Sequence, residues 1–227
     1  MAACPWDGFE AATIAFCENR LCSWVVEPAN TWSNIGFVIV GLYLYWHAKR
    51  HSLPNLHYIG AIVFFEGLGS AFFHGSGTFI GEVADVGCMY LISGMFICVA
   101  LLRIGTLNHR QALWLYLVIA VGSTAVLIWF KTIGIALFAF QVTLATILEI
   151  YLRRFRRSDV RYGWLLTMVI CFAIAFFIWN MDIRGIWCDP DNHIFTGHSA
   201  WHLLNAFCMY CYYQFVRQFV ERGSWVQ

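Results

Sequence analysis

The chain has 227 residues, of which 60% are apolar or aromatic and only 12% are charged. Soluble domains contain about 25% charged residues, so this composition, with a mean hydropathy of +0.65, excludes an ordinary soluble domain. The net charge of +1 gives no reason to expect nucleic-acid binding. Residues 1–15 contain Asp7 and Glu10 and no basic region, so we expect no signal peptide and an integral membrane protein whose first hydrophobic helix directs insertion.

Seven apolar stretches follow in chain order, and each is a candidate transmembrane helix, because a hydrocarbon core of about 30 Å needs about 20 helical residues. The stretches cover residues 32–46, 56–73, 83–102, 112–130, 133–151, 164–179 and 198–215. The first is short, and we expect it to extend into its polar neighbours. The fourth and fifth are separated by a few residues around Lys131, which predicts a tight hairpin.

No long linker or repeat interrupts this series. The sequence therefore predicts an all-α, polytopic membrane protein with a single domain, a seven-transmembrane-helix bundle over residues 1–227. Within it we expect an extracytoplasmic N-terminal segment at 1–31, the helical bundle at 32–218 and a cytoplasmic tail at 219–227.

Basic residues alternate between the connecting segments. They follow the first, third, fifth and seventh stretches: Lys49, Arg50, Arg103, Arg110, Arg153, Arg154, Arg156, Arg157, Arg161, Arg217 and Arg222. The intervening loops contain few bases. By the positive-inside rule, this pattern predicts an N-terminus outside and a C-terminus in the cytoplasm, in agreement with an odd number of helices.

Polar residues within the apolar stretches gather at the predicted outer side. Ser70 and His74 lie four residues apart near the end of the second stretch, and His198 and His202 lie four apart at the start of the seventh. Residues at this spacing share one helical face. Asp85 lies near the start of the third stretch. Because polar residues in membrane segments are costly, five of them at one depth predict a functional site.

Three histidines favour a catalytic zinc site, since the fourth tetrahedral position then stays open for water. Zinc lowers the pKa of such a water and polarises a carbonyl group. Asp85 is then a candidate general base or a partner that orients a histidine, and Ser70 is a candidate donor to a developing oxyanion. A His-x-x-x-His pair alone is also compatible with haem or with no ligand at all.

Three blocks of sequence resemble the alkaline ceramidase family, which belongs to a wider group of membrane hydrolases that includes the progestin and adipoQ receptors. The first is CENR…EPANTWSN over residues 17–34, and the second is SAFFH over residues 70–74, followed by the acid at position 85. The third is GHSAWH over residues 197–202. The blocks occur in the family's order, and the hydropathy is similar along essentially the whole chain.

The resemblance implies seven helices and a zinc ion held by His74, His198 and His202. It makes Asp85 the proton acceptor and Ser70 the oxyanion donor in the hydrolysis of a lipid amide. The implied substrate is ceramide or a related N-acyl lipid, and the products are a sphingoid base and a fatty acid. We expect the membrane and this lipid as partners, with no nucleic acid and no obligate protein partner.

The resemblance also implies a calcium site in the acidic N-terminal segment. Glu18, Asn19 and Glu27 match positions of that pattern, and such oxygen donors suit calcium. The match is incomplete, because Ala15 and Phe16 stand where eukaryotic members carry Asp-Trp. A solvated acid beside a capped helix start is the other interpretation of this segment.

Further departures bear on substrate and host. Glu82 and the pair Asp85-Val86 stand where eukaryotic members tend to have Gln and then Asp-Glu, so strict ceramide specificity is not expected. The short chain and the EPAN motif at residues 27–30 resemble those of a bacterial member. This favours a bacterial inner membrane, with an ER or Golgi membrane expected if the protein is eukaryotic.

Four cysteines, at positions 4, 17, 22 and 188, lie outside the apolar stretches, where disulfides can form. We predict that Cys17 pairs with Cys188, which would join the N-terminal segment to the loop before the seventh stretch.

Three other functional classes also use bundles of membrane helices. A zinc-containing seven-helix receptor or sensor of the adipoQ type and a membrane transporter remain alternatives to the enzyme, although a transporter usually places its polar residues at the midplane. A retinal protein is excluded, because it needs a lysine within the bundle and Lys49 and Lys131 are both expected in loops.

Overall fold

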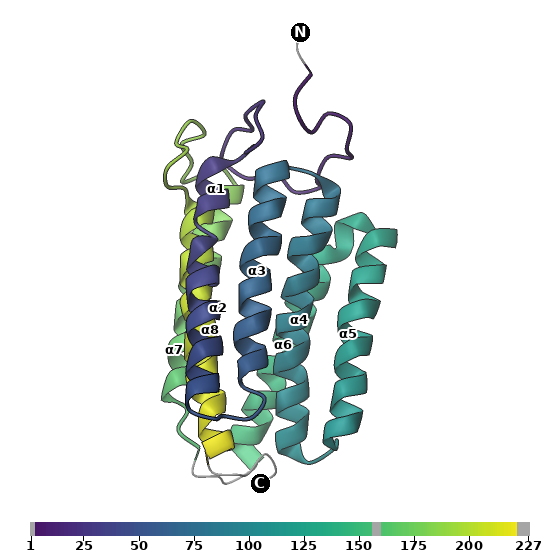
Figure 1. Ribbon diagram of the computed structural model, residues 1–227, viewed down its shortest axis with the longest axis vertical. Helices are drawn as coiled ribbons and strands as arrows, with labels where there is room; N and C mark the ends of the chain where they lie inside the picture. Colours follow the sequence, from purple (N-terminus) through teal and green to yellow (C-terminus); the bar gives the residue numbers. More distant parts are fainter. Residues whose placement is uncertain (1–2, 156–159, 222–227) are drawn as a thin grey trace. The chain divides into compact units, whose positions relative to one another are not determined.

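The computed structural model describes residues 3–155 and 160–221 (Figure 1). Arg156, Arg157, Arg222 and the end of the predicted tail at 223–227 lie outside these ranges. The described residues are helical throughout, apart from loops and one isolated β-bridge between Ala11 and Thr78. The predicted all-α class is therefore confirmed.

Each of the seven apolar stretches coincides with a long helix. These are α2 (Ile35–Arg50), α3 (His57–Ser76), α4 (Phe79–Ile104), α5 (His109–Trp129), α6 (Gly134–Phe155), α7 (Gly163–Ile183) and α8 (Gly197–Glu221). A short helix, α1 (Pro28–Trp32), precedes α2, and a 3-10 turn, Lys131–Ile133, forms the predicted hairpin between α5 and α6. Only Ser33 and Asn34 separate α1 from α2, and both have right-handed helical backbone angles, so the first stretch does extend into its polar neighbours.

Among the described residues, five helices are long and apolar enough to cross a membrane by length and composition. They begin at residues 57, 79, 109, 131 and 163. Helix α2 does not reach this standard, because its 16 residues span only about 24 Å at about 1.5 Å per residue. Helix α8 has the length, but its histidines, asparagine and glutamine lower its hydropathy.

The chain divides into two compact units, which are described separately. The first contains Met1–Asp85 and Tyr162–Val216, and the second contains Val86–Arg161 and Arg217–Gln227. Within the second unit, the buried Gln141 joins two helices, because its amide donates to Ser123 on α5 (2.7 Å) and accepts from Ser93 on α4 (2.6 Å). Arg103, expected in a loop, instead lies buried in the last turn of α4 and forms an ion pair with Glu149.

In the first unit, α2 and α3 pack so closely that glycine is required where they meet. A Cβ atom on Gly41 would lie 2.5 Å from the backbone nitrogen of Phe64, and one on Gly60 would lie 2.4 Å from that of Tyr45. Small residues allow this approach between membrane helices. The close packing fixes α3, the helix that carries Ser70 and His74.

The N-terminal segment crosses the turn between α3 and α4. Gly77 ends α3 with a positive φ of 62°, which glycine adopts without strain. Next to it, the Phe79 amide donates to the carbonyl of Glu10 at 2.8 Å. The buried Glu82 carboxylate accepts from both the amide and the hydroxyl of Thr13, each at 2.6 Å. These contacts place the N-terminal segment at the same end of the first unit as the start of α4 and the end of α3.

Candidate metal centre

Three histidines from two helices meet inside the first unit. His74 lies in the last turn of α3, and His198 and His202 lie in the first two turns of α8. One ring nitrogen of each lies within 4.8 Å of the others, and the Nε2 atoms of His74 and His198 are 3.1 Å apart. All three side chains are buried, so the structure brings together the three ligands that the sequence predicted.

Hydrogen bonds on the far side of two rings determine which nitrogen faces the centre. Glu27 Oε2 lies 2.7 Å from His74 Nδ1, and a carboxylate can only accept, so Nδ1 carries the proton. Ser33 donates its hydroxyl to the carbonyl of Asn30 at 3.0 Å, and it therefore accepts from His202 Nδ1 at 2.7 Å. Neutral imidazole has one donor and one acceptor nitrogen, so both Nε2 atoms present lone pairs to the centre.

This donor set fits zinc. Zinc–nitrogen bonds of about 2.0–2.1 Å in a tetrahedron hold their nitrogens about 3.3–3.4 Å apart, close to the 3.1 Å between His74 and His198. His74 and His202 each present an Nε2 lone pair, and a neutral imidazole nitrogen of this kind is a common metal ligand. Partners on the outer ring nitrogens, such as Glu27 and Ser33, are the usual means of orienting metal-binding histidines.

Glu27 is almost completely buried and is held from several directions. One carboxylate oxygen, Oε2, accepts from His74 and from the side-chain amide of Asn30 at 3.2 Å. The other, Oε1, accepts from Arg20 at 3.2 Å. Burial by itself raises the pKa of Glu27, but His74, Asn30 and Arg20 outweigh it, so that the pKa lies below its ordinary value. Glu27 is therefore an ionised partner of His74.

Ser70 and Asp85 lie beside the histidines. The Ser70 hydroxyl is 3.5 Å from His202 Nε2, one turn before His74 on α3. Asp85, in the second turn of α4, interacts with the Ser70 hydroxyl and electrostatically with His74. The two residues are buried, and with the three histidines they form the group that the sequence placed at one depth.

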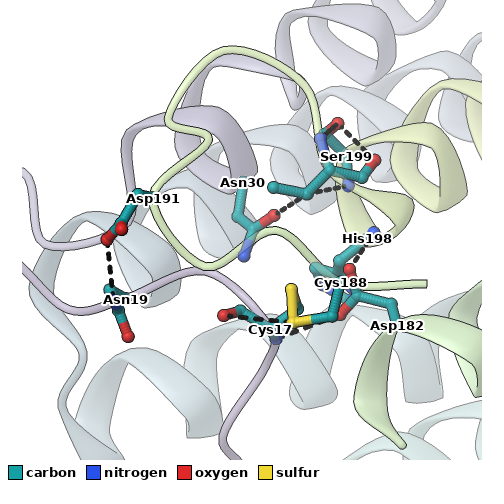
Figure 2. The surroundings of a disulfide bond; sticks show 9 residues. Cys17, Asn19, Asn30, Asp182, Cys188, Asp191, His198 and Ser199 are labelled. Atoms are coloured by element: carbon teal, nitrogen blue, oxygen red, sulfur yellow. Dashed lines mark hydrogen bonds between the residues drawn. A yellow bond between two sulfur atoms is a disulfide. The ribbon is translucent and has the colours of Figure 1, made fainter. Parts of the chain in front are cut away.

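Asp182, at the end of α7, fixes the start of α8. Its Oδ2 accepts from the backbone amide of His198 at 3.0 Å, and its Oδ1 accepts from the amide of Cys17 at 3.1 Å (Figure 2). The first amides of a helix lack intrahelical partners, and a carboxylate also interacts favourably with the helix dipole there. Asp182 thus holds the helix that carries two of the histidines.

Two disulfides anchor the N-terminal segment. One joins Cys17 to Cys188 (Figure 2), the pair expected from the sequence, and the other joins Cys4 to Cys22. The residue before Cys17, Phe16, stacks on the His198 ring with 3.9 Å between ring centroids. The segment therefore places an aromatic ring directly against a metal-binding candidate.

The three residues expected to bind calcium have other partners. Glu18 accepts from the backbone amides of Ala29 and Asn30, each at 2.9 Å, at the start of α1, and it also contacts His193 at 2.9 Å. Asn19 donates to Asp191 (Figure 2). Within the described ranges, the histidine cluster is the group of three or more His, Cys, Asp or Glu side chains close enough together to hold a metal ion. The structure therefore gives no support for calcium.

Sequence reasoning did not find the residues that orient the site. The sequence predicts calcium binding for Glu27 and gives no role to Ser33 or Arg20. Glu27 lies 47 residues along the chain from His74, which it contacts, and Ser33 lies 169 residues from its partner His202. No spacing within one helix signals such pairs.

Comparison with known proteins shows the family of the chain. The ceramidase family model matches residues 8–222, which is nearly the whole chain. The chain belongs to the ceramidase family. An alkaline ceramidase of Drosophila melanogaster is 26% identical over 216 residues, a match that covers 88% of this chain and 75% of the relative. The family resemblance predicted from the sequence is thereby confirmed.

Proposed function

We propose that this member of the ceramidase family is a zinc-dependent hydrolase that cleaves the amide bond of ceramide or a related N-acyl lipid. The observation that carries the proposal is the convergence of three buried imidazoles, two with Nε2 lone pairs directed inward, beside a serine and an aspartate. Family membership supports hydrolysis of a lipid amide as the reaction. The products would be a sphingoid base and a fatty acid.

His74, His198 and His202 would hold the zinc ion, and three protein ligands are the number typical of catalytic zinc sites. Bound there, zinc supplies Lewis-acid polarisation of the carbonyl and lowers the pKa of water. Glu27 and Ser33 keep two of the imidazoles in the tautomer that binds metal. This arrangement gives a reason for buried histidines on α3 and α8, whose other residues are mostly apolar.

Asp85 and Ser70 would carry out the proton transfer and the charge stabilisation. As water adds to the amide carbon, its proton passes to the Asp85 carboxylate and then to the nitrogen of the leaving amine. The carbonyl oxygen gains negative charge in this step, and the Ser70 hydroxyl is placed to donate a hydrogen bond to it. The contact between Ser70 and Asp85 keeps the two groups on the same side of the site.

We further propose a single seven-helix membrane domain with its N-terminus outside and its C-terminus in the cytoplasm, in a bacterial inner membrane. The alternation of basic residues along the chain supports this orientation. A green fluorescent protein fused to the C-terminus should fluoresce in bacterial cells. A dark fusion together with an active C-terminal alkaline phosphatase fusion would reverse the topology.

Metal analysis tests the proposed function first. We expect the detergent-purified protein to contain about one zinc ion per chain by inductively coupled plasma mass spectrometry, and the His198→Ala/His202→Ala variant to contain none. His51→Ala, which changes an exposed histidine, is the matched control and should keep its zinc.

A lipid assay then tests the reaction. Ceramides and other N-acyl lipids are incubated with the zinc-loaded protein, and the released amine and fatty acid are measured by mass spectrometry. Release that is lost in the double histidine variant supports the proposal. Bound zinc with no cleavage of any N-acyl lipid would favour the receptor alternative, which the comparisons do not favour.

A further inference from the structure

Arg20 reaches the metal centre through one intermediate residue. Its Nε donates to Glu27 Oε1 at 3.2 Å, and its Nη2 donates to the carbonyl of Ile14 at 3.0 Å. The opposite oxygen of the same carboxylate, Glu27 Oε2, lies 2.7 Å from His74 Nδ1. A continuous path thus runs from a partly exposed guanidinium, through a buried carboxylate, to a candidate metal ligand.

The backbone around Arg20 is held on both sides. The amide of Asn19 donates to the carbonyl of Pro190, and the amide of Leu21 donates to the carbonyl of Val26, each at 2.9 Å. Disulfides at positions 17 and 22 close the segment at its two ends. Because the segment is anchored at these points, the position of the guanidinium is set by the fold, which is the condition for a preorganised contact.

The turn at Gly77 packs against the Arg20 side chain. A Cβ atom on Gly77 would lie 3.8 Å from Cζ of Arg20, so the turn that ends α3 passes directly against the guanidinium. The planar fork of arginine donates in two directions at once, here to Glu27 and to Ile14. A lysine ammonium is a point charge and would not reproduce both contacts in the same plane.

We infer that Arg20 is a positioning residue of the metal centre, acting through Glu27 on His74; this inference rests on the proposed function. A buried carboxylate is stable only when it is paired, and Arg20 supplies the positive charge on the side away from the histidine. It directs Oε1 outward, which leaves Oε2 aimed at His74. The chain itself therefore supplies the positive charge beside Glu27, as the Arg20 guanidinium.

Zinc affinity tests the inference without reference to activity. The purified wild type, Arg20→Met, Glu27→Gln and the double variant compete with a fluorescent zinc chelator. Arg20→Met should weaken zinc binding about threefold to fivefold, because an ion pair that is one-third exposed contributes only modestly. In the Glu27→Gln background the same change should have no further effect, because Arg20 acts through that carboxylate.

Two more variants and a spectrum complete the design. Arg20→Lys should recover part of the lost affinity, and Arg20→Gln replaces Arg20→Met if the latter does not fold. In the cobalt-substituted protein, Arg20→Met should shift the visible absorption of the metal, which a distant structural change would not do. Arg184→Met, which alters an exposed arginine in the loop before α8, is the control and should match the wild type.

The outcomes are distinct. Wild-type zinc affinity in Arg20→Met, or losses from Arg20→Met and Glu27→Gln that multiply in the double variant, would overturn the inference and leave the proposed function intact. Zinc retained by the His198→Ala/His202→Ala variant would instead overturn the proposed function itself.

Discussion

Replacing Glu27 by glutamine should weaken zinc binding about tenfold. The hydrogen bond from His74 Nδ1 to Glu27 Oε2 is 2.7 Å long, and both side chains are buried. A hydrogen bond to a charged group contributes about 1.5–3 kcal/mol and a neutral one about 0.5–1.5 kcal/mol. Glutamine preserves the size and one acceptor oxygen, so the loss is close to the difference, about 1.4 kcal/mol, which is tenfold in affinity.

Chelator competition at fixed pH measures this loss directly. The matched control is Glu10→Gln, because Glu10 is an exposed acidic residue on the same N-terminal segment. Removal of a partner of a metal ligand lowers metal affinity by about 10–100-fold in other sites. An affinity of Glu27→Gln within twofold of the control would refute the role of Glu27 in orienting His74.

The remaining predictions concern catalysis and stability. Asp85→Asn should lower kcat by about 10²–10⁴-fold while zinc content stays at the wild-type level; loss of the metal as well would mean that Asp85 is structural. Ser70→Ala should lower kcat by about 10²-fold with little change in KM, and unchanged turnover would remove Ser70 from the reaction. Asp182→Ala removes the acceptor of the His198 amide at the start of α8 and should reduce stability by about 0.5–2 kcal/mol, seen as a lower Tm in detergent, whereas a wild-type Tm would contradict this. Non-reducing mass mapping should recover Cys17 linked to Cys188, and finding both as free thiols would disprove the pair.

The helices were predictable because the length and apolar composition of a stretch are local properties of the sequence. Every stretch from residues 32–46 to 198–215 lies in a helix of the structure, with ends that differ by a few residues. The spacing of four between Ser70 and His74, and between His198 and His202, puts each pair on one face for the same reason. Helix α8 is less apolar than the other long helices, because its polar side chains make contacts in the interior of the first unit, His202 with Ser33 and Tyr213 with His47.

The expectation of calcium shows where sequence reasoning ends. Acidic residues at positions 18 and 27 are visible in the sequence, but whether their charge needs an external cation depends on neighbours that are distant along the chain. In the structure, Glu18 caps α1 with the amides of Ala29 and Asn30. Glu27 is paired with Arg20 and His74. The carboxylates are satisfied by the chain itself.

The sequence by itself determined the all-α class, the order of the helices, the family and the three histidines, because each of these depends on local spacing or on contiguous motifs. Only the tertiary structure decided which nitrogen of His74 and of His202 faces the centre. That choice depends on Glu27 and Ser33, which approach the rings from the opposite side. Such contacts arise when separate helices and the anchored N-terminal segment pack together, and no local pattern specifies them.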